Sequence, residues 1–122
     1  MIHIQVKRYQ DGLEIHAVGH AEYAPRGKDV VCAGVSALLY GFVAYLKTLL
    51  SVATAKGEAC GGELLQCKGY ERDGELWVRT RGEVSRITEG FAVVEAGIRL
   101  LAKTYPDRIV VEKIDFTGRR RT

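Results

Sequence analysis

The chain has 122 residues, of which 47% are hydrophobic and 27% are charged. This length and balance predict one globular domain that buries its own core, and they exclude a disordered chain. The formal net charge of +3 is too small to indicate nucleic-acid binding by itself, so we expect no direct nucleic-acid partner.

The cysteine pattern indicates a reducing compartment. The chain has three cysteines, an odd number, and no charged-then-apolar secretory leader opens it, so we expect free thiols and a cytoplasmic protein. Cys60 and Cys67 do not form a Cys-X-X-Cys pair, and no two histidines stand at zinc-ligand spacing, so we expect no metal site. We interpret Cys67 as a core residue and Cys60 as a loop thiol.

The N-terminal segment predicts two strands joined by a tight turn. Apolar residues alternate with polar ones before and after Asp11-Gly12, which is the period of half-buried strands on either side of a turn signal. The expected inward positions are Ile2, Ile4, Val6, Leu13, Ile15 and Ala17. His3 and His16 then face outward among charged residues, and we interpret both as solvated surface side chains.

A loop and a long helix follow the second strand. The strand runs into Gly19 and His20, and residues 22–28 contain proline and glycine without periodicity, which is typical of a loop. Asp29 is expected to cap a helix that begins at Val30. This apolar stretch also contains lysine and polar residues, so we expect a one-sided buried helix rather than a membrane span. Its expected core face consists of Val31, Val35, Leu38, Leu39, Phe42, Leu46, Leu49 and Leu50.

Two further strands and a second helix come next. The strands are predicted around 65–67 and 76–80, with a turn at Arg72-Asp73-Gly74 between them. Ser85 is expected to cap the second helix, and Pro106 to stop it. The expected core face of that helix consists of Ile87, Phe91, Val94, Ile98, Leu101 and Tyr105.

A fifth strand at 109–116 completes the pattern. Its Ile109-Val110-Val111 run predicts a strand covered on both faces. The order ββαββαβ predicts an α+β fold in which a mostly antiparallel sheet is packed by two helices. We expect residues 1–116 to form the single domain and 117–122 to form a basic tail, in which Arg119-Arg120-Arg121 is a frayed end.

Cys32 and His20 form the strongest candidate for chemistry. Nucleophilic cysteine catalysis needs a readily ionised thiol and a nearby imidazole that moves the proton. Cys32 is expected in the first helical turn, where unpaired amides and the helix dipole favour a thiolate. The loop would fold His20 back over this helix start, so we predict a thiol protease site. The alternative is that Cys32 is a small buried hydrophobe.

Four further residues are candidates for supporting roles. Asp29 either only caps the helix or also orients His20 or a substrate amide. Ser36 lies one turn after Cys32 on the same side, or it back-bonds within the helix. Gly19 is a turn glycine or admits a substrate backbone. The backbone amides of Cys32 and Ala33 are the expected oxyanion donors.

The motifs Gly19-His20-Ala21, Asp29-Val30-Val31-Cys32-Ala33 and Ser36-Ala37-Leu38 resemble the signature of the ribosomal-processing cysteine protease family, Prp. The resemblance implies a small homodimeric protease without a cofactor, in which His20 and Cys32 are the catalytic pair. It also implies that Asp29 and Ser36 support the site.

The resemblance also implies a substrate. The family removes a short N-terminal extension from ribosomal large-subunit protein twenty-seven, and related prophage sequences imply a phage structural protein as the alternative. Two other classes of function stay open. One is a non-enzymatic ribosome- or phage-assembly protein that uses the same groove, and the other is a redox-sensing thiol.

Overall fold

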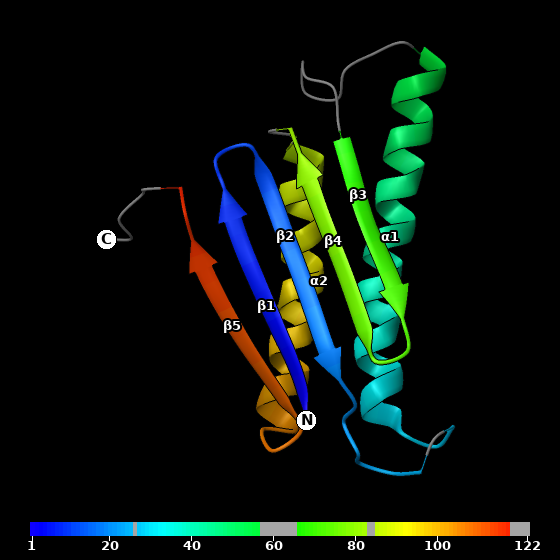
Figure 1. Ribbon diagram of the computed structural model, residues 1–122, viewed down its shortest axis with the longest axis vertical. Helices are drawn as coiled ribbons and strands as arrows, with labels where there is room; N and C mark the ends of the chain where they lie inside the picture. Colours follow the sequence, from blue (N-terminus) through cyan, green and yellow to red (C-terminus); the bar gives the residue numbers. More distant parts are fainter. Residues whose placement is uncertain (26, 57–65, 83–84, 118–122) are drawn as a thin grey trace.

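The computed structural model describes residues 1–25, 27–56, 66–82 and 85–117. They form five strands and two helices in the predicted order: β1 (Ile2–Tyr9), β2 (Gly12–Gly19), α1 (Val30–Lys56), β3 (Gln66–Arg72), β4 (Glu75–Arg81), α2 (Ser85–Thr104) and β5 (Ile109–Asp115) (Figure 1). The predictions for Cys60, Leu65 and Arg119–Arg121 lie outside the described residues, as does the side chain of Leu50.

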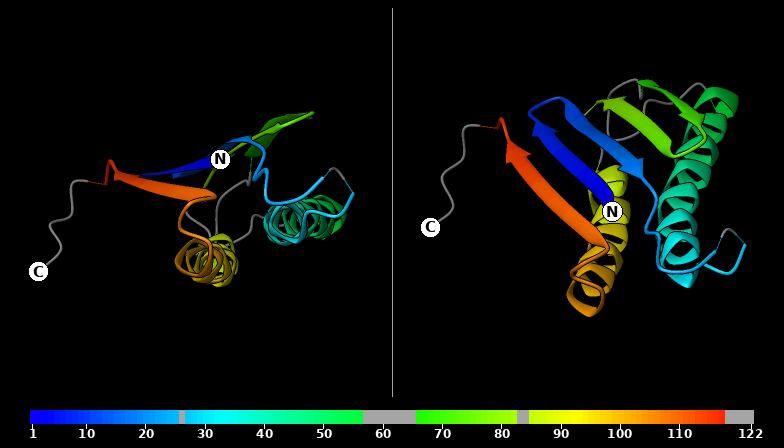
Figure 2. Two further views of the ribbon diagram at one scale, coloured as in Figure 1. Left: turned by 90° about the horizontal axis from the view of Figure 1, so that it is seen from below. Right: turned by 60° about the horizontal axis from the view of Figure 1, so that its bottom comes forward.

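The strands form one sheet in the order β3-β4-β2-β1-β5. The pairs β1–β2, β2–β4 and β3–β4 are antiparallel, whereas β1 and β5 are parallel, which confirms the mostly antiparallel α+β prediction. Both helices pack on the same face of this sheet (Figure 2). The end of β2, the β3–β4 turn and the start of α1 lie at the same end of the molecule (Figure 1).

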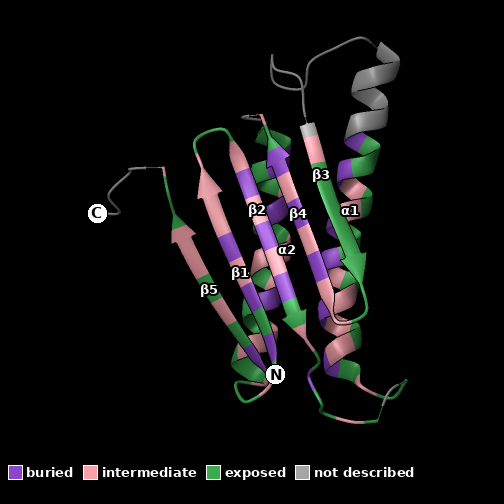
Figure 3. Ribbon diagram, in the orientation of Figure 1, coloured by how far each residue is buried: buried purple, intermediate pink, exposed green. Residues whose placement is uncertain are grey.

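The core lies between the sheet and the two helices, and alternation along the strands creates it (Figure 3). Phe42 of α1 and Phe91 of α2 meet there edge to face, with ring centroids 5.3 Å apart. Full burial of such a side chain contributes about 1.5–3 kcal/mol. Among the side chains that the structure describes, the buried apolar residues of the helices are Val31, Val35, Leu39, Phe42, Leu46, Leu49, Ile87, Phe91 and Ile98.

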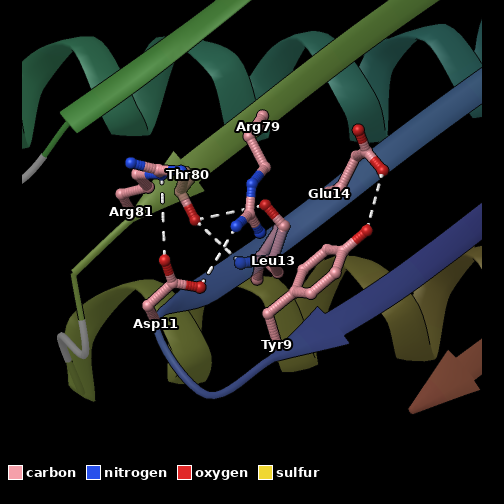
Figure 4. Close-up of polar contacts among 7 residues, drawn as sticks. All are labelled: Tyr9, Asp11, Leu13, Glu14, Arg79, Thr80 and Arg81. Carbon is pink, nitrogen blue, oxygen red and sulfur yellow. Dashed lines mark hydrogen bonds and ion pairs between the residues drawn. The ribbon is translucent and has the colours of Figure 1, made fainter. Parts of the chain in front are cut away.

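The far end of the sheet is fixed by a polar network around the β1–β2 turn (Figure 4). Asp11 accepts a hydrogen bond from Arg79 at 3.1 Å, and the guanidinium of Arg79 lies 4.0 Å from the centroid of the Tyr9 ring. The buried hydroxyl of Thr80 accepts a hydrogen bond from the backbone N–H of Leu13 at 3.1 Å. These contacts hold the start of β2 against β4.

Helix α1 is also long and apolar enough to span a membrane by length and composition alone. Its Val30–Leu49 window has a mean hydropathy of 1.7, and 28% of the window is buried. One face of the helix lies on the sheet, as its apolar spacing predicts, and that face supplies most of the helical side of the core.

Two predictions about individual positions are wrong. The fifth strand is not covered on both faces, because β5 is an edge strand and the helices cover only one face of the sheet; Val110 is 42% exposed. His16 is not a freely solvated side chain, because its Nε2 atom lies 2.6 Å from Oε2 of Glu75 on the neighbouring strand. Both errors come from contacts between strands, which a local pattern does not contain.

Candidate active site

Asp29 builds the start of α1. Its Oδ1 atom accepts hydrogen bonds from the backbone N–H groups of Val31 and Cys32, both at 3.0 Å, which confirms the predicted cap. Its Oδ2 atom accepts hydrogen bonds from the N–H groups of Tyr23 and Ala24 at 3.0 and 3.5 Å. One carboxylate therefore joins the loop to the helix.

These bonds decide the ionisation of Asp29. Removal from water raises its pKa, but the hydrogen bonds from the four backbone N–H groups outweigh that effect, so the pKa of Asp29 lies below its ordinary value of 3.8. Both carboxylate oxygens bind backbone N–H groups, so in this arrangement Asp29 acts as a cap and a loop clamp.

The expected oxyanion donors are engaged elsewhere. The N–H of Cys32 binds the Asp29 side chain, and the N–H of Ala33 donates to the Asp29 carbonyl oxygen at 3.0 Å. A different amide points at the sulfur: the N–H of Ala21 donates to Sγ of Cys32 at 3.2 Å. The sequence gives no signal for this contact, because it depends on how the loop returns to the helix.

The loop after β2 is anchored to the α2–β5 connection. Arg108 donates from one guanidinium nitrogen to the carbonyl oxygens of Ala21 and Glu22, at 3.4 and 2.8 Å. Glu22 has a φ of +54°, a left-handed conformation that is uncommon outside glycine. Tyr23 packs edge to face on Tyr105, with ring centroids 5.3 Å apart. Arg108 and Tyr105 thus hold the segment that carries the Ala21 amide.

His20 follows directly after β2 and has an exposed side chain. Its ring lies against the β3–β4 turn, where a Cβ atom built on Gly74 would lie 2.8 Å from Nε2. The N–H of Gly19 donates to the carbonyl oxygen of Gly74 at 2.8 Å, and the His20 carbonyl oxygen accepts a hydrogen bond from the Met1 ammonium at 2.6 Å.

A cavity of about 310 Å³ brings most of the predicted residues together. His20, Cys32, Ser36 and Gly19 all line it, whereas Asp29 and Ala33 do not. Its apolar lining consists of Ile2, Ala17, Val35, Leu39 and Leu76. Within the described part of the chain no hydrogen bond joins His20 to Cys32, whose sulfur accepts from Ala21 instead. The cavity holds the imidazole and the thiol in one space without a direct bond between them.

Sequence reasoning missed one wall of this cavity. Tyr40 of α1 and Glu71, Asp73 and Gly74 of the β3–β4 hairpin line it as well. A hydrogen bond with Glu71, together with desolvation and the charge of that carboxylate, raises the pKa of Tyr40. The sequence predicts a turn at 72–74, but only the sheet order β3-β4-β2 shows that this turn reaches His20.

A cysteine and a histidine that line one cavity at the start of a helix, in an α+β domain, form the kind of site that thiol proteases use. The sequence profile of the family described as "Cysteine protease Prp" matches residues 1–110. The chain therefore belongs to this family of ribosomal processing cysteine proteases.

Individual relatives agree with this assignment. The ribosomal processing cysteine protease Prp of Mycoplasma genitalium is 26% identical over 97 residues, which cover 80% of this chain and 84% of the relative. The Prp of Bacillus subtilis is 42% identical over a shorter stretch of 45 residues, which is 35% of this chain and 40% of that protein.

The fold is shared with a solved structure. The ribosomal processing protease Prp of Staphylococcus aureus, in complex with a covalently linked product peptide, superposes with a TM-score of 0.70 at 18% identity. The alignment covers 93% of this chain and 99% of that one. At 18% sequence identity, this similarity shows that the two chains have the same fold.

Proposed function

We propose that this protein is a cysteine endopeptidase in which Cys32 is the nucleophile and His20 the general base. The sulfur of Cys32 attacks a peptide carbonyl carbon while His20 takes the thiol proton, and the same imidazole later gives that proton to the leaving amine. Water then attacks the thioester and releases the second product. The observation that carries the proposal is that the imidazole and the thiol line one cavity in a member of a cysteine protease family.

The surrounding residues have supporting roles in this proposal. Asp29 keeps Cys32 in the first turn of α1, and Ser36 lines the cavity one turn further along the helix. Gly19 lines the same cavity directly before His20, and its missing side chain leaves space for the Met1 carbonyl group. The Ala21 N–H, which points at the sulfur at 3.2 Å, is the amide best placed to stabilise the oxyanion that forms beside it.

The proposed substrate is the N-terminal extension of ribosomal large-subunit protein twenty-seven. Support comes from the family and from relatives that are named ribosomal processing proteases. We also propose that the enzyme works as a homodimer in the cytoplasm, without a cofactor, a membrane or a nucleic-acid partner. A phage structural protein is the alternative substrate for the same chemistry.

Incubation with the extended ribosomal protein tests this proposal directly. We expect two fragments whose masses, measured by mass spectrometry, add up to the precursor plus one water. The Cys32→Ser variant should leave the precursor intact while it retains the wild-type circular dichroism spectrum. Cleavage by this variant, or an intact precursor with both proteins, contradicts the proposed function.

Selective alkylation separates the enzyme from a binding protein that uses the same groove. Desolvation raises the pKa of the Cys67 thiol, so Cys67 should react slowly with iodoacetamide at neutral pH and serves as an internal control. Faster labelling of Cys32 than of Cys67 and Cys60 supports an activated nucleophile. Equal, slow labelling supports the binding protein, and a peroxide-dependent disulfide supports the redox sensor.

A further inference from the structure

The turn between β3 and β4 forms the surface on which the His20 ring rests. Strand β3 ends at Arg72 and β4 begins at Glu75, and these two residues are partners in the sheet. Asp73 and Gly74 therefore form a two-residue turn. Gly74 has a φ of +72°, a left-handed conformation that glycine adopts without steric cost.

The contact between Gly74 and His20 leaves no room for a side chain. A Cβ atom on Gly74 would lie 2.8 Å from Nε2 of His20, and 3.4 and 3.5 Å from Cε1 and Cδ2. Real Cβ atoms essentially never approach another heavy atom within 3.0 Å. The imidazole thus occupies the space that any side chain at position 74 needs.

A backbone hydrogen bond fixes the turn relative to the histidine. The N–H of Gly19, the residue directly before His20, donates to the Gly74 carbonyl oxygen at 2.8 Å. The turn and the backbone next to His20 are therefore held together, which places Gly74 beside the imidazole ring. The same turn also lines the cavity that contains Cys32.

We propose that Gly74 is a positioning residue for His20. Because Gly74 has no side chain, the imidazole packs directly against the β3–β4 turn, in the cavity that Cys32 also lines. This inference rests on the proposed protease function. A side chain at position 74 displaces the ring and changes the position of the base relative to the thiol, although both groups remain in the chain.

The Gly74→Ala variant tests this role. We expect kcat for the extended substrate to fall by at least about tenfold, since a displaced base loses part of its contribution to proton transfer. KM should stay within about twofold of the wild-type value, because the rest of the cavity lining is unchanged.

A matched variant separates this contact from backbone strain. Gly82 has a φ of +114° and directly follows the other end of β4, so Gly82→Ala imposes left-handed strain far from His20. Its kcat should match the wild type. Equal losses in Gly74→Ala and Gly82→Ala overturn the inference.

Gly74→Asn guards against misfolding, because asparagine tolerates left-handed φ but carries the same Cβ; wild-type activity in this variant also overturns the inference.

A double-mutant comparison distinguishes positioning of His20 from an unrelated defect. In the His20→Ala background, Gly74→Ala should cause no further loss, because the group that Gly74 positions is absent. An additional loss of the same size as in the wild-type background overturns the inference.

The rate at which iodoacetamide modifies Cys32 gives a second readout that needs no substrate. His20→Ala should slow this reaction at neutral pH, and Gly74→Ala should slow it too, by no more than His20→Ala does; an unchanged rate in Gly74→Ala overturns the inference. If the wild type shows no Cys32-dependent cleavage, the proposed function fails, while the alkylation rates still decide whether Gly74 positions His20.

Discussion

Asp29 joins the loop after His20 to the first turn of α1 through one carboxylate, so the charged form of this carboxylate stabilises the folded structure. Removal from water raises the pKa of Asp29, but backbone hydrogen bonds lower it below 3.8 overall. Because the folded-state pKa lies below the unfolded-state value, the associated stability is fully present above about pH 4. It is lost as the pH falls through the lower, folded-state value.

The Asp29→Asn variant measures this effect. Asparagine caps helices about as well as aspartate but does not titrate. As the pH falls from about 4 to about 2, we expect the Tm of the wild type, measured by thermal unfolding, to decrease more than the Tm of the variant. A Tm difference that stays constant across this range contradicts the prediction. Asp29→Ala, which lacks a capping oxygen, should lose about 1 kcal/mol at neutral pH.

His20 and Cys32 act as one unit in the proposed mechanism, so their losses should not add. His20→Ala should lower kcat/KM by about 10² or more, and Cys32→Ala should abolish cleavage. The double variant should be no worse than Cys32→Ala alone. Peptide cleavage assays with circular dichroism as the folding control measure this. His20→Ala with wild-type kcat/KM would remove His20 from the mechanism.

At the scale of elements, the loop after β2 depends on the α2–β5 connection. Arg108 binds the carbonyl oxygens of Ala21 and Glu22, and the Ala21 N–H in turn binds the Cys32 sulfur. Arg108→Ala releases both carbonyls and should loosen this amide from the sulfur. A loss of about 1 kcal/mol in transition-state stabilisation corresponds to a several-fold fall in kcat/KM.

Arg99→Ala is the control for Arg108→Ala. Arg99 lies on α2, where its ion pair with Glu95 one turn away is long, at 3.9 Å, and such surface pairs contribute little. Steady-state kinetics of both variants should show a loss for Arg108→Ala alone. Equal kinetics in the two variants would show that the loop anchor does not act on the site.

Local sequence patterns predict most of the helices and strands because these patterns depend on residues that are close together in the chain. The capping role of Asp29 and the alternation in β1, β2 and β4 need only neighbouring residues, and the structure confirms them. The place of β5 at the sheet edge is different. An apolar run such as that of β5 is also typical of a central strand, so only the pairing of strands distinguishes an edge strand from a central one.

At the scale of the whole molecule, the site combines near and distant parts of the sequence. His20 and Cys32 are close in the chain, so a local motif identifies both. Tyr40 and Gly74 come to the same cavity through the packing of α1 and the order β3-β4-β2. No local pattern contains that order, which is why the sequence indicates the two proposed reacting groups but not the cavity wall next to the imidazole.

The packing of α1 against α2 forms part of the core, and Phe42 tests its contribution to stability. Phe42 is 2% exposed and meets Phe91 across the two helices. Phe42→Ala should cost about 3–5 kcal/mol, a large fraction of the 5–15 kcal/mol that stabilises a typical domain. Urea unfolding should show a much lower midpoint, whereas Leu100→Ala, at a position 66% exposed, should stay near the wild type. Equal midpoints for the two variants would mean that the helices do not share one cooperative core.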